Sequence, residues 1–209
     1  MDTVLLAAGL SARMNGRQKL LLPWGDGTVI GHCVRQALLG LDGSGNVTVV
    51  TGCDGNDVRK ALEPLQEQQQ RGVFGTTKLQ FIHNAHYQDG QFSSTLAGIA
   101  AVQRGQPFFI TMGDLPLITA DHYRKLVPLL RDYDAVRPAC DGVPGHPVLH
   151  SAGLRDAILA LPADRTMRGL LATKKIKAPD DGDIAWISDI DTPEAYRSLY
   201  ALTFGGLPS

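Results

Sequence analysis

Short apolar runs recur along the 209-residue chain, and helix-like stretches separate them. Runs of this length that are rich in β-branched residues are typical of buried strands, and strands that alternate with helices form a mostly parallel sheet between helical layers. The sequence therefore predicts a three-layer α/β fold. Strands are expected at 4–6, 47–50, 79–82, 108–111, 135–138 and 184–187, and helices at 28–40, 55–70, 94–104, 120–132, 151–160 and 193–203.

Composition narrows the class of protein. A hydrophobic content of 44% and a formal net charge of −1 suit a globular chain that buries one core, so residues 1–209 are expected to form a single domain. Basic residues are not in excess over acidic ones, so the composition does not point to a nucleic-acid partner. No apolar run approaches the roughly 18–20 residues that span a bilayer, and no signal-like segment precedes the first strand. Membrane insertion and export are therefore disfavoured.

The cysteine pattern indicates the compartment. Cys33, Cys53 and Cys140 are odd in number and widely separated, so the sequence predicts neither a disulfide framework nor a CxxC metal site. A cytoplasmic location is expected.

The loop after the first expected strand is built from small residues and carries two cations, Arg13 and Lys19. Small residues let backbone N–H groups approach a polyphosphate closely, and the two cations can neutralise its charge. The sequence contains neither GxxxxGK[ST] nor GxGxxG at this place, which excludes the Walker and dinucleotide signatures. The alternative is an ordinary turn with basic surface residues.

Asp114 follows the expected strand 108–111 in the string Gly113-Asp114-Leu115-Pro116. A carboxylate at the end of a strand, facing a basic loop, suits a Mg²⁺ ion that is shared with substrate phosphates. The alternative is that the Asp114 side chain caps a turn before Pro116 or the helix that starts at Thr119.

Two further carboxylates, Asp189 and Asp191, lie near the end of the chain. In an extended segment they point to the same side, because side chains alternate with period two. Both could then face the metal. The alternative is helix capping, since Asp191 or Thr192 before Pro193 is a good helix start.

Four motifs occur in order: Leu6-Ala7-Ala8-Gly9-Leu10-Ser11-Ala12-Arg13-Met14, Gly113-Asp114-Leu115-Pro116, Gly145-His146-Pro147-Val148 and Asp189-Ile190-Asp191-Thr192-Pro193-Glu194. Together they resemble the MobA-like family of nucleotidyltransferases, which attach a nucleoside monophosphate to the molybdenum cofactor. Asn15 stands where the family usually has Gly, and Lys19 lies one residue further from Arg13 than in the shorter form of the motif.

The resemblance implies a Rossmann-like nucleotidyltransferase fold and a set of site residues. Arg13, Lys19 and Asp114 are the implied catalytic residues, and Asp114 and Asp191 the implied Mg²⁺ ligands, with Asp189 as the alternative to Asp191. The implied substrate-binding residues are Leu6, Ala7, Ala8, Gly9, Ser11, Arg13, Lys19, Gly90, Ser93, Ser94 and His146. As alternatives to binding, Ser93 or Ser94 could cap the N-terminus of a helix, and His146 could have a structural role in its loop.

The resemblance also implies a reaction: transfer of CMP from CTP to the terminal phosphate of molybdopterin, with release of pyrophosphate. CTP is expected because the sequence has Leu6-Ala7-Ala8-Gly9 where the guanine-transferring branch usually has LAGG. The N-terminal part would bind mainly nucleotide and the C-terminal part mainly acceptor, and a molybdenum hydroxylase could receive the product. Alternatives are a guanylyltransferase, a sugar-phosphate nucleotidyltransferase, or a carrier that hands the cofactor to such a hydroxylase.

Overall fold

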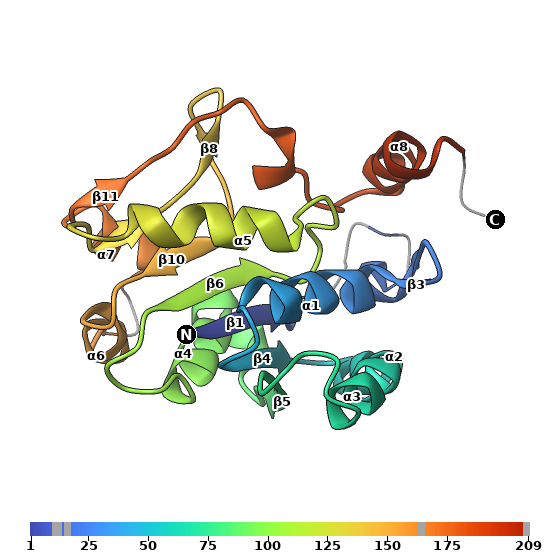
Figure 1. Ribbon diagram of the computed structural model, residues 1–209, viewed down its shortest axis with the longest axis horizontal. Coiled ribbons are helices and arrows are strands. Elements are labelled where there is room, and N and C mark those ends of the chain that lie inside the picture. Colours follow the sequence, from blue (N-terminus) through green and yellow to red (C-terminus); the bar gives the residue numbers. More distant parts are fainter. Residues whose placement is uncertain (10–13, 15–17, 163–165, 207–209) are drawn as a thin grey trace.

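A seven-stranded sheet lies at the centre of the computed structural model, with helices on both faces (Figure 1). The structure describes residues 1–9, 14, 18–162 and 166–206. The strand order is β11-β7-β10-β6-β1-β4-β5, and β10 runs antiparallel to both of its neighbours while the other neighbouring pairs are parallel. The strands are β1 (Asp2–Ala7), β4 (Asn46–Thr51), β5 (Lys78–His83), β6 (Phe108–Met112), β7 (Ala135–Val136), β10 (Val148–His150) and β11 (Ile176–Lys177).

Eight α-helices are assigned within the described ranges, together with four short 3₁₀ turns and two small hairpins. The helices are α1 (Val29–Gly40), α2 (Gly55–Ala61), α3 (Glu63–Gln70), α4 (Gln91–Ala100), α5 (Ala120–Leu126), α6 (Leu154–Leu159), α7 (Met167–Leu171) and α8 (Pro193–Phe204). The 3₁₀ turns are η1 (Lys19–Leu21), η2 (Tyr87–Asp89), η3 (Val127–Leu129) and η4 (Ile184–Trp186). The hairpins pair β2 (Pro23–Trp24) with β3 (Gly27–Thr28) and β8 (Ala139–Cys140) with β9 (Val143–Pro144).

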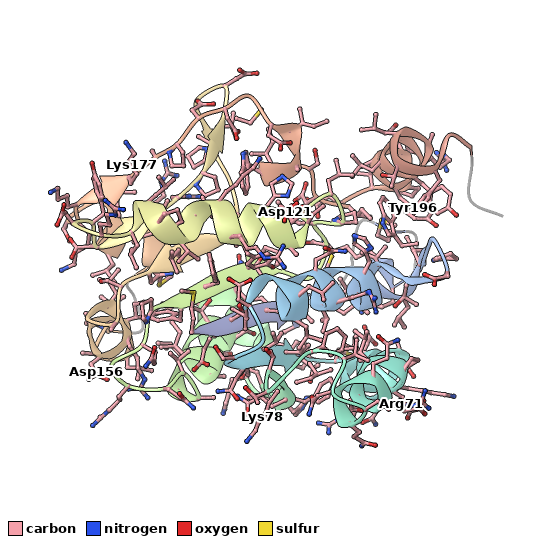
Figure 2. All side chains as sticks on the ribbon, viewed as in Figure 1. Arg71, Lys78, Asp121, Asp156, Lys177 and Tyr196 are labelled. Atoms are coloured by element: carbon pink, nitrogen blue, oxygen red, sulfur yellow. The ribbon has the colours of Figure 1, made fainter. Side chains whose placement is uncertain are left out.

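Strand β1 is buried along its whole length, so it contributes to the core on both faces of the sheet. Leu5 and Ala7 belong to the cluster that packs under α1 and α5, and Val4 and Leu6 belong to the cluster under α4 and α6. This alternation follows from the period of two in a strand. Because helices cover both faces of the sheet, the central strands have nearly continuous apolar sequences. Side chains fill the space between the sheet and its helices (Figure 2).

The expected α/β class and mostly parallel sheet are confirmed, but the strand expected at 184–187 is wrong. These residues form η4. The Asp183 carboxylate accepts a hydrogen bond from the backbone N–H of Ala185 at 2.9 Å, and the Trp186 indole donates to Asp181 at 2.7 Å. The Trp186 ring also packs edge-on against His122, with 4.5 Å between ring centroids. Local side-chain caps and an aromatic contact therefore satisfy this apolar segment without a neighbouring strand.

Prolines shorten two of the expected helices. Residues 55–70 form two helices, α2 and α3, with the break at Leu62, and Pro64 lies in the first turn of α3. Residues 120–132 are α-helical only to Leu126, and Pro128 lies in the 3₁₀ turn that follows. Proline has no N–H for the i→i−4 bond, so it is tolerated at the start of a helix and not in its interior.

Strand β10 was not predicted from the sequence. It has only three residues after Gly145-His146-Pro147, which is too short for an alternation of apolar and polar residues to be recognised.

The C-terminal segment returns to the sheet and contacts the ends of its central strands. The backbone N–H of Ile190 donates to the carbonyl of Asp114 at 3.0 Å. Further along, the Tyr196 hydroxyl donates to the carbonyl of Pro23 at 2.8 Å, and Trp24 packs edge-on against Tyr200. Helix α8 accordingly lies at the same end of the molecule as β3 (Figure 1).

Cys33 and Cys140 are buried and Cys53 is exposed, and all three are free thiols, as the spacing predicts. In the described part of the chain, no helix has both the length and the apolar character needed to cross a membrane.

Gly145 fixes the 145–148 motif against η4, and it supplies a stability prediction. A Cβ at this residue would lie 2.3 Å from the carbonyl oxygen of Trp186, whereas a Cβ at Gly153 would meet no atom within 4 Å. We expect Gly145→Ala to lower the free energy of unfolding by about 1–3 kcal/mol, because backbone atoms must move. The control Gly153→Ala should change it by no more than about 0.5 kcal/mol. Denaturant unfolding checks both values, and equal stability of the two variants would contradict the prediction.

Candidate active site

The carboxyl ends of β1 and β6 bring two of the motifs together. The strands are parallel neighbours with Leu6 opposite Met112, and the N–H of Gly113 donates to the carbonyl of Leu6 at 2.9 Å. Asp114 therefore lies beside the start of the small-residue loop. In open α/β sheets this edge is where ligands bind.

The structure describes the first part of that loop. Leu6 and Ala7 are buried, Ala8 is half-buried and Gly9 is exposed. Of the other predicted residues, Ser11 and Arg13 lie outside the described residues, so their roles stay predictions.

Lys19 begins η1, and its ammonium group forms ion pairs with the carboxylates of Asp114 and Asp191, the latter at 2.9 Å. Burial by itself lowers the pKa of Lys19, but the charges of Asp114 and Asp191 and the hydrogen bonds to them outweigh burial, so the pKa is raised. Lys19 is therefore fully charged at neutral pH. The structure thus joins three segments that are far apart in the sequence.

Neither of these two carboxylates caps the helix that follows it. Thr119 and His122 form the capping box of α5, and the Thr192 hydroxyl accepts the N–H of Ala195 at the start of α8. The carboxylates of Asp114 and Asp191 lie instead at the strand ends, where both pair with Lys19. Asp114 is 5% exposed, and its Oδ1 has no hydrogen-bond partner among the described residues. A buried carboxylate oxygen of this kind needs a cation or a donor.

Asp114, Asp189 and Asp191 form an acidic cluster in which each offers one carboxylate oxygen within 4.8 Å of the other two. The segment 189–191 is not a strand, yet Asp189 and Asp191 do lie together. Ile190 between them is fully buried, so its neighbours are turned outward on the same side. Three oxygen donors of this kind fit a hard divalent cation such as Mg²⁺ or Mn²⁺.

Asp189 is the exposed member of the acidic cluster. Partial desolvation and the like charges of Asp191 and Asp114 raise its pKa, and the nearby charge of Lys19 only partly offsets them. A divalent cation would remove this repulsion.

Gly90, Ser93 and Ser94 form the entry to α4. Gly90 takes a positive φ of 100°, which favours glycine, and α4 begins at Gln91, so neither serine is the N-cap. The Asn84 amide donates to Ser93 Oγ at 2.8 Å and to Ser94 Oγ at 2.9 Å. Ser94 is 2% exposed. The two hydroxyls thus hold the turn, and contact with a nucleotide stays a prediction. No motif in the sequence indicated that Asn84 would take part in this turn.

His146 lines a cavity of about 500 Å³ on the α4 side of the sheet. Burial and the charge of Arg137 lower the pKa of His146, so the imidazole is neutral at physiological pH. Sequence reasoning missed other polar residues of this cavity, because they come from separate segments without a motif: Gln91, Arg137, His150 and Arg168. A smaller cavity of about 210 Å³ lies at the ends of β4 and β5, lined by Thr51, Gly52, Cys53, Asn56, Arg59 and His83 among others.

Comparison with known proteins gives the family. Residues 3–179 match the model of the MobA-like NTP transferase domain. The chain belongs to this family. It is 32% identical over 196 residues to the molybdenum cofactor cytidylyltransferase of Escherichia coli K12, covering 94% of this chain and 93% of the relative. The expected family and nucleotidyltransferase class are thereby confirmed.

Two other similar proteins show the range of this fold. The nicotine blue oxidoreductase of Paenarthrobacter nicotinovorans is 28% identical, covering 94% of this chain and 95% of the relative. A manganese complex of Rv0371c from Mycobacterium tuberculosis H37Rv superposes with a TM-score of 0.69 at 22% identity, covering 95% of this chain and 97% of that one. The MobA-like chain therefore shares its architecture with a solved structure.

The acidic cluster predicts a cation-dependent stability. At a Mn²⁺ or Mg²⁺ concentration of about 100 times Kd, we expect Tm to rise by about 5–10 °C, because the ion binds only the folded state. Asp114→Asn and Asp191→Asn should lose this rise, and Asp132→Asn, at an exposed site, should keep it. Thermal denaturation with and without a chelator checks this, and an undiminished rise in Asp114→Asn would refute the metal assignment.

Asp189 generates a pH prediction. Its raised pKa means that the ionised carboxylate destabilises the folded state above the ordinary carboxyl pKa of 3.8. In chelator-treated buffer at pH 7, Asp189→Asn should therefore be slightly more stable than the native protein. The difference should vanish below pH 3.8, where the carboxyl is protonated in both the folded and unfolded states. Urea unfolding across this range tests the sign, and a less stable variant at pH 7 would contradict it.

Proposed function

We propose that this protein transfers CMP from CTP to the terminal phosphate of molybdopterin and releases pyrophosphate. The observation that carries the proposal is the meeting of Lys19, Asp114 and Asp191 at the strand ends that hold the Leu6-Ala7-Ala8-Gly9 loop. The molybdenum cofactor cytidylyltransferase of E. coli, similar over nearly the whole chain, supports the choice of nucleotide and acceptor.

The reaction is a direct substitution at phosphorus. An oxygen of the acceptor phosphate attacks the α-phosphorus of CTP, the bond from that phosphorus to the bridging oxygen breaks, and pyrophosphate leaves with the electron pair. No protein nucleophile is required. Positioning and neutralisation of charge supply most of the catalysis in such transfers.

The residues of the strand ends then have separate tasks. Lys19, charged and held by Asp114 and Asp191, supplies positive charge to the triphosphate, and Arg13 is proposed to do the same. Asp114 and Asp191, or Asp189 in place of Asp191, would hold Mg²⁺, which neutralises phosphate oxygens when it is bound. The backbone of Ala7, Ala8 and Gly9 would lie along the phosphates.

The proposal divides the chain by task within one domain. The N-terminal part binds the nucleotide, with Gly90, Ser93 and Ser94 bordering it, and the C-terminal part with His146 binds the acceptor. A cytoplasmic setting, in which a molybdenum hydroxylase receives the product, is part of the same proposal. Three free thiols support the setting.

The competing function is suggested by the oxidoreductase relative. An oxidoreductase reaction does not by itself call for carboxylates around a lysine, whereas a metal–triphosphate complex uses carboxylates to hold the metal and a cation to bind the phosphates. The acidic cluster therefore favours nucleotidyl transfer in this chain.

The experiment offers each nucleoside triphosphate separately to the protein with molybdenum cofactor and Mg²⁺, and then identifies the nucleotide that is attached to the pterin. We expect CMP alone. Attachment of GMP would reverse the choice of base and keep the mechanism. A sugar phosphate offered as acceptor tests that alternative, and absence of transfer with active cofactor would leave the carrier function.

The same assay tests the roles of individual residues. Asp114→Ala should lower kcat by about 10³-fold or more, and Lys19→Gln by about 10²–10³-fold, because each removes charge aimed at the reacting phosphates. Arg124→Gln alters ion pairs with Asp42 and Asp121 and a hydrogen bond to the Leu39 carbonyl, all of which belong to α1, α5 and the turn after α1 and none of which is part of the proposed site, so it should retain native turnover. Circular dichroism of each variant controls for folding, and near-native turnover by folded Asp114→Ala would refute its assignment.

A further inference from the structure

We propose that the 500 Å³ cavity between the sheet, α4 and α7 is the acceptor pocket, in which Arg137 and Arg168 bind an anionic group of the acceptor and His150 hydrogen-bonds to its ring system. The inference rests on the proposed function, because it names the residues that receive the acceptor of that reaction.

The cavity has the shape and surface of a small-molecule site. Its floor is an apolar patch on three adjacent strands, made by Leu6 of β1, Ile110 of β6 and Val148 of β10, with Val148 directly opposite Ile110. Phe92 of α4 and Leu171 of α7 also line it. A volume of this size, with an apolar floor and polar side chains around it, is typical of pockets for organic ligands that carry polar groups.

His150 is the most deeply buried polar group of the cavity. Its side chain is 1% exposed and stacks on Phe108, with 5.1 Å between ring centroids and 10° between the ring planes. Among the described residues, neither ring nitrogen makes a hydrogen bond of good geometry, although backbone groups of Val148 and Phe108 are close enough to act against the lowering of its pKa. Burial lowers the pKa of His150 to about 4, so the neutral ring offers one donor and one acceptor at pH 7. An unpaired buried polar group is costly, and a polar heterocycle such as a pterin can satisfy it.

The charged residues among the described lining of the cavity are two arginines, Arg137 and Arg168. Arg137 is half-buried, and its Nε is buried without a partner among the described residues. Burial and the like charge of Arg168 lower the pKa of Arg137. None of the described residues that line the cavity is acidic. Two arginines that repel each other, beside described lining residues that include no carboxylate, are suited to a phosphate, since guanidinium groups bind phosphate oxygens in pairs.

The cavity adjoins the proposed catalytic residues. Leu6 directly precedes the Ala7-Ala8-Gly9 loop, and Asp114 lies two residues beyond Met112, the last residue of the strand that carries Ile110. His146 lines the cavity, and the pKa of its imidazole responds to the charges of both Arg137 and Asp114. The part of the cavity at Leu6 and His146 therefore lies against the same strand ends as the acidic cluster, and His150, opposite Phe108, lies toward the other end of β6.

The test compares Arg137→Gln, Arg168→Gln and the matched control Arg71→Gln, whose side chain is exposed on the outer side of α3 (Figure 2). Three quantities are measured for each: the Kd of molybdopterin without nucleotide, by fluorescence titration, and the KM of molybdopterin and the KM of CTP in the transfer assay. We expect each cavity variant to raise the Kd and KM of molybdopterin by about tenfold, because one charge-assisted contact is lost. The KM of CTP should stay within about twofold, and Arg71→Gln should resemble the native protein.

The possible outcomes separate this inference from the proposed function. Cavity variants that bind molybdopterin as Arg71→Gln does would overturn the inference, as would variants that raise the KM of CTP instead. If the native protein binds molybdopterin through both arginines but transfers no CMP, the pocket stands and the proposed function fails. Arg168 is exposed on α7, so Arg168→Gln keeps the test valid if Arg137→Gln does not fold.

Discussion

The site depends on the ion pairs that Lys19 makes with Asp114 and Asp191. These residues come from the start, the middle and the end of the chain, and parallel pairing of β1 with β6 brings the first two to the same edge of the sheet. Enclosing charges in this way gives little net stability, because removal from water offsets the attraction. The arrangement is better understood as a means of fixing three charged groups for a ligand that is itself highly charged.

A second constraint is the return of the C-terminal segment to the sheet. Ile190 donates its backbone N–H to Asp114, and the N–H of His146 donates to the carbonyl of Trp186 at 2.9 Å. Both contacts use backbone groups of the segment 186–190. The same segment therefore positions Asp189 and Asp191 on one side and the His146 wall of the cavity on the other. The acidic cluster and the proposed acceptor pocket share one structural support.

The difference between prediction and structure has identifiable physical causes. The strands at 4–6, 47–50, 79–82 and 108–111 were correctly predicted because their apolar runs are long enough to be unambiguous. The segment 184–187 has a similar composition, but the Asp181 and Asp183 carboxylates and the His122 ring satisfy it locally as a 3₁₀ turn. Helix α4 begins three residues before the predicted start, since Gly90 at positive φ is the N-terminal boundary.

The sequence by itself determined the α/β class, the positions of the central strands, and the basic and acidic residue types that nucleotide chemistry needs. It also predicted the family through four motifs in order. Only the tertiary structure decided that Lys19 contacts both Asp114 and Asp191, and that Arg137, His150 and Arg168 line one cavity. The physical reason is that local patterns fix how a strand forms and which way its side chains alternate. Which segments become neighbours depends on strand order across the sheet, here with β10 inserted antiparallel between β7 and β6.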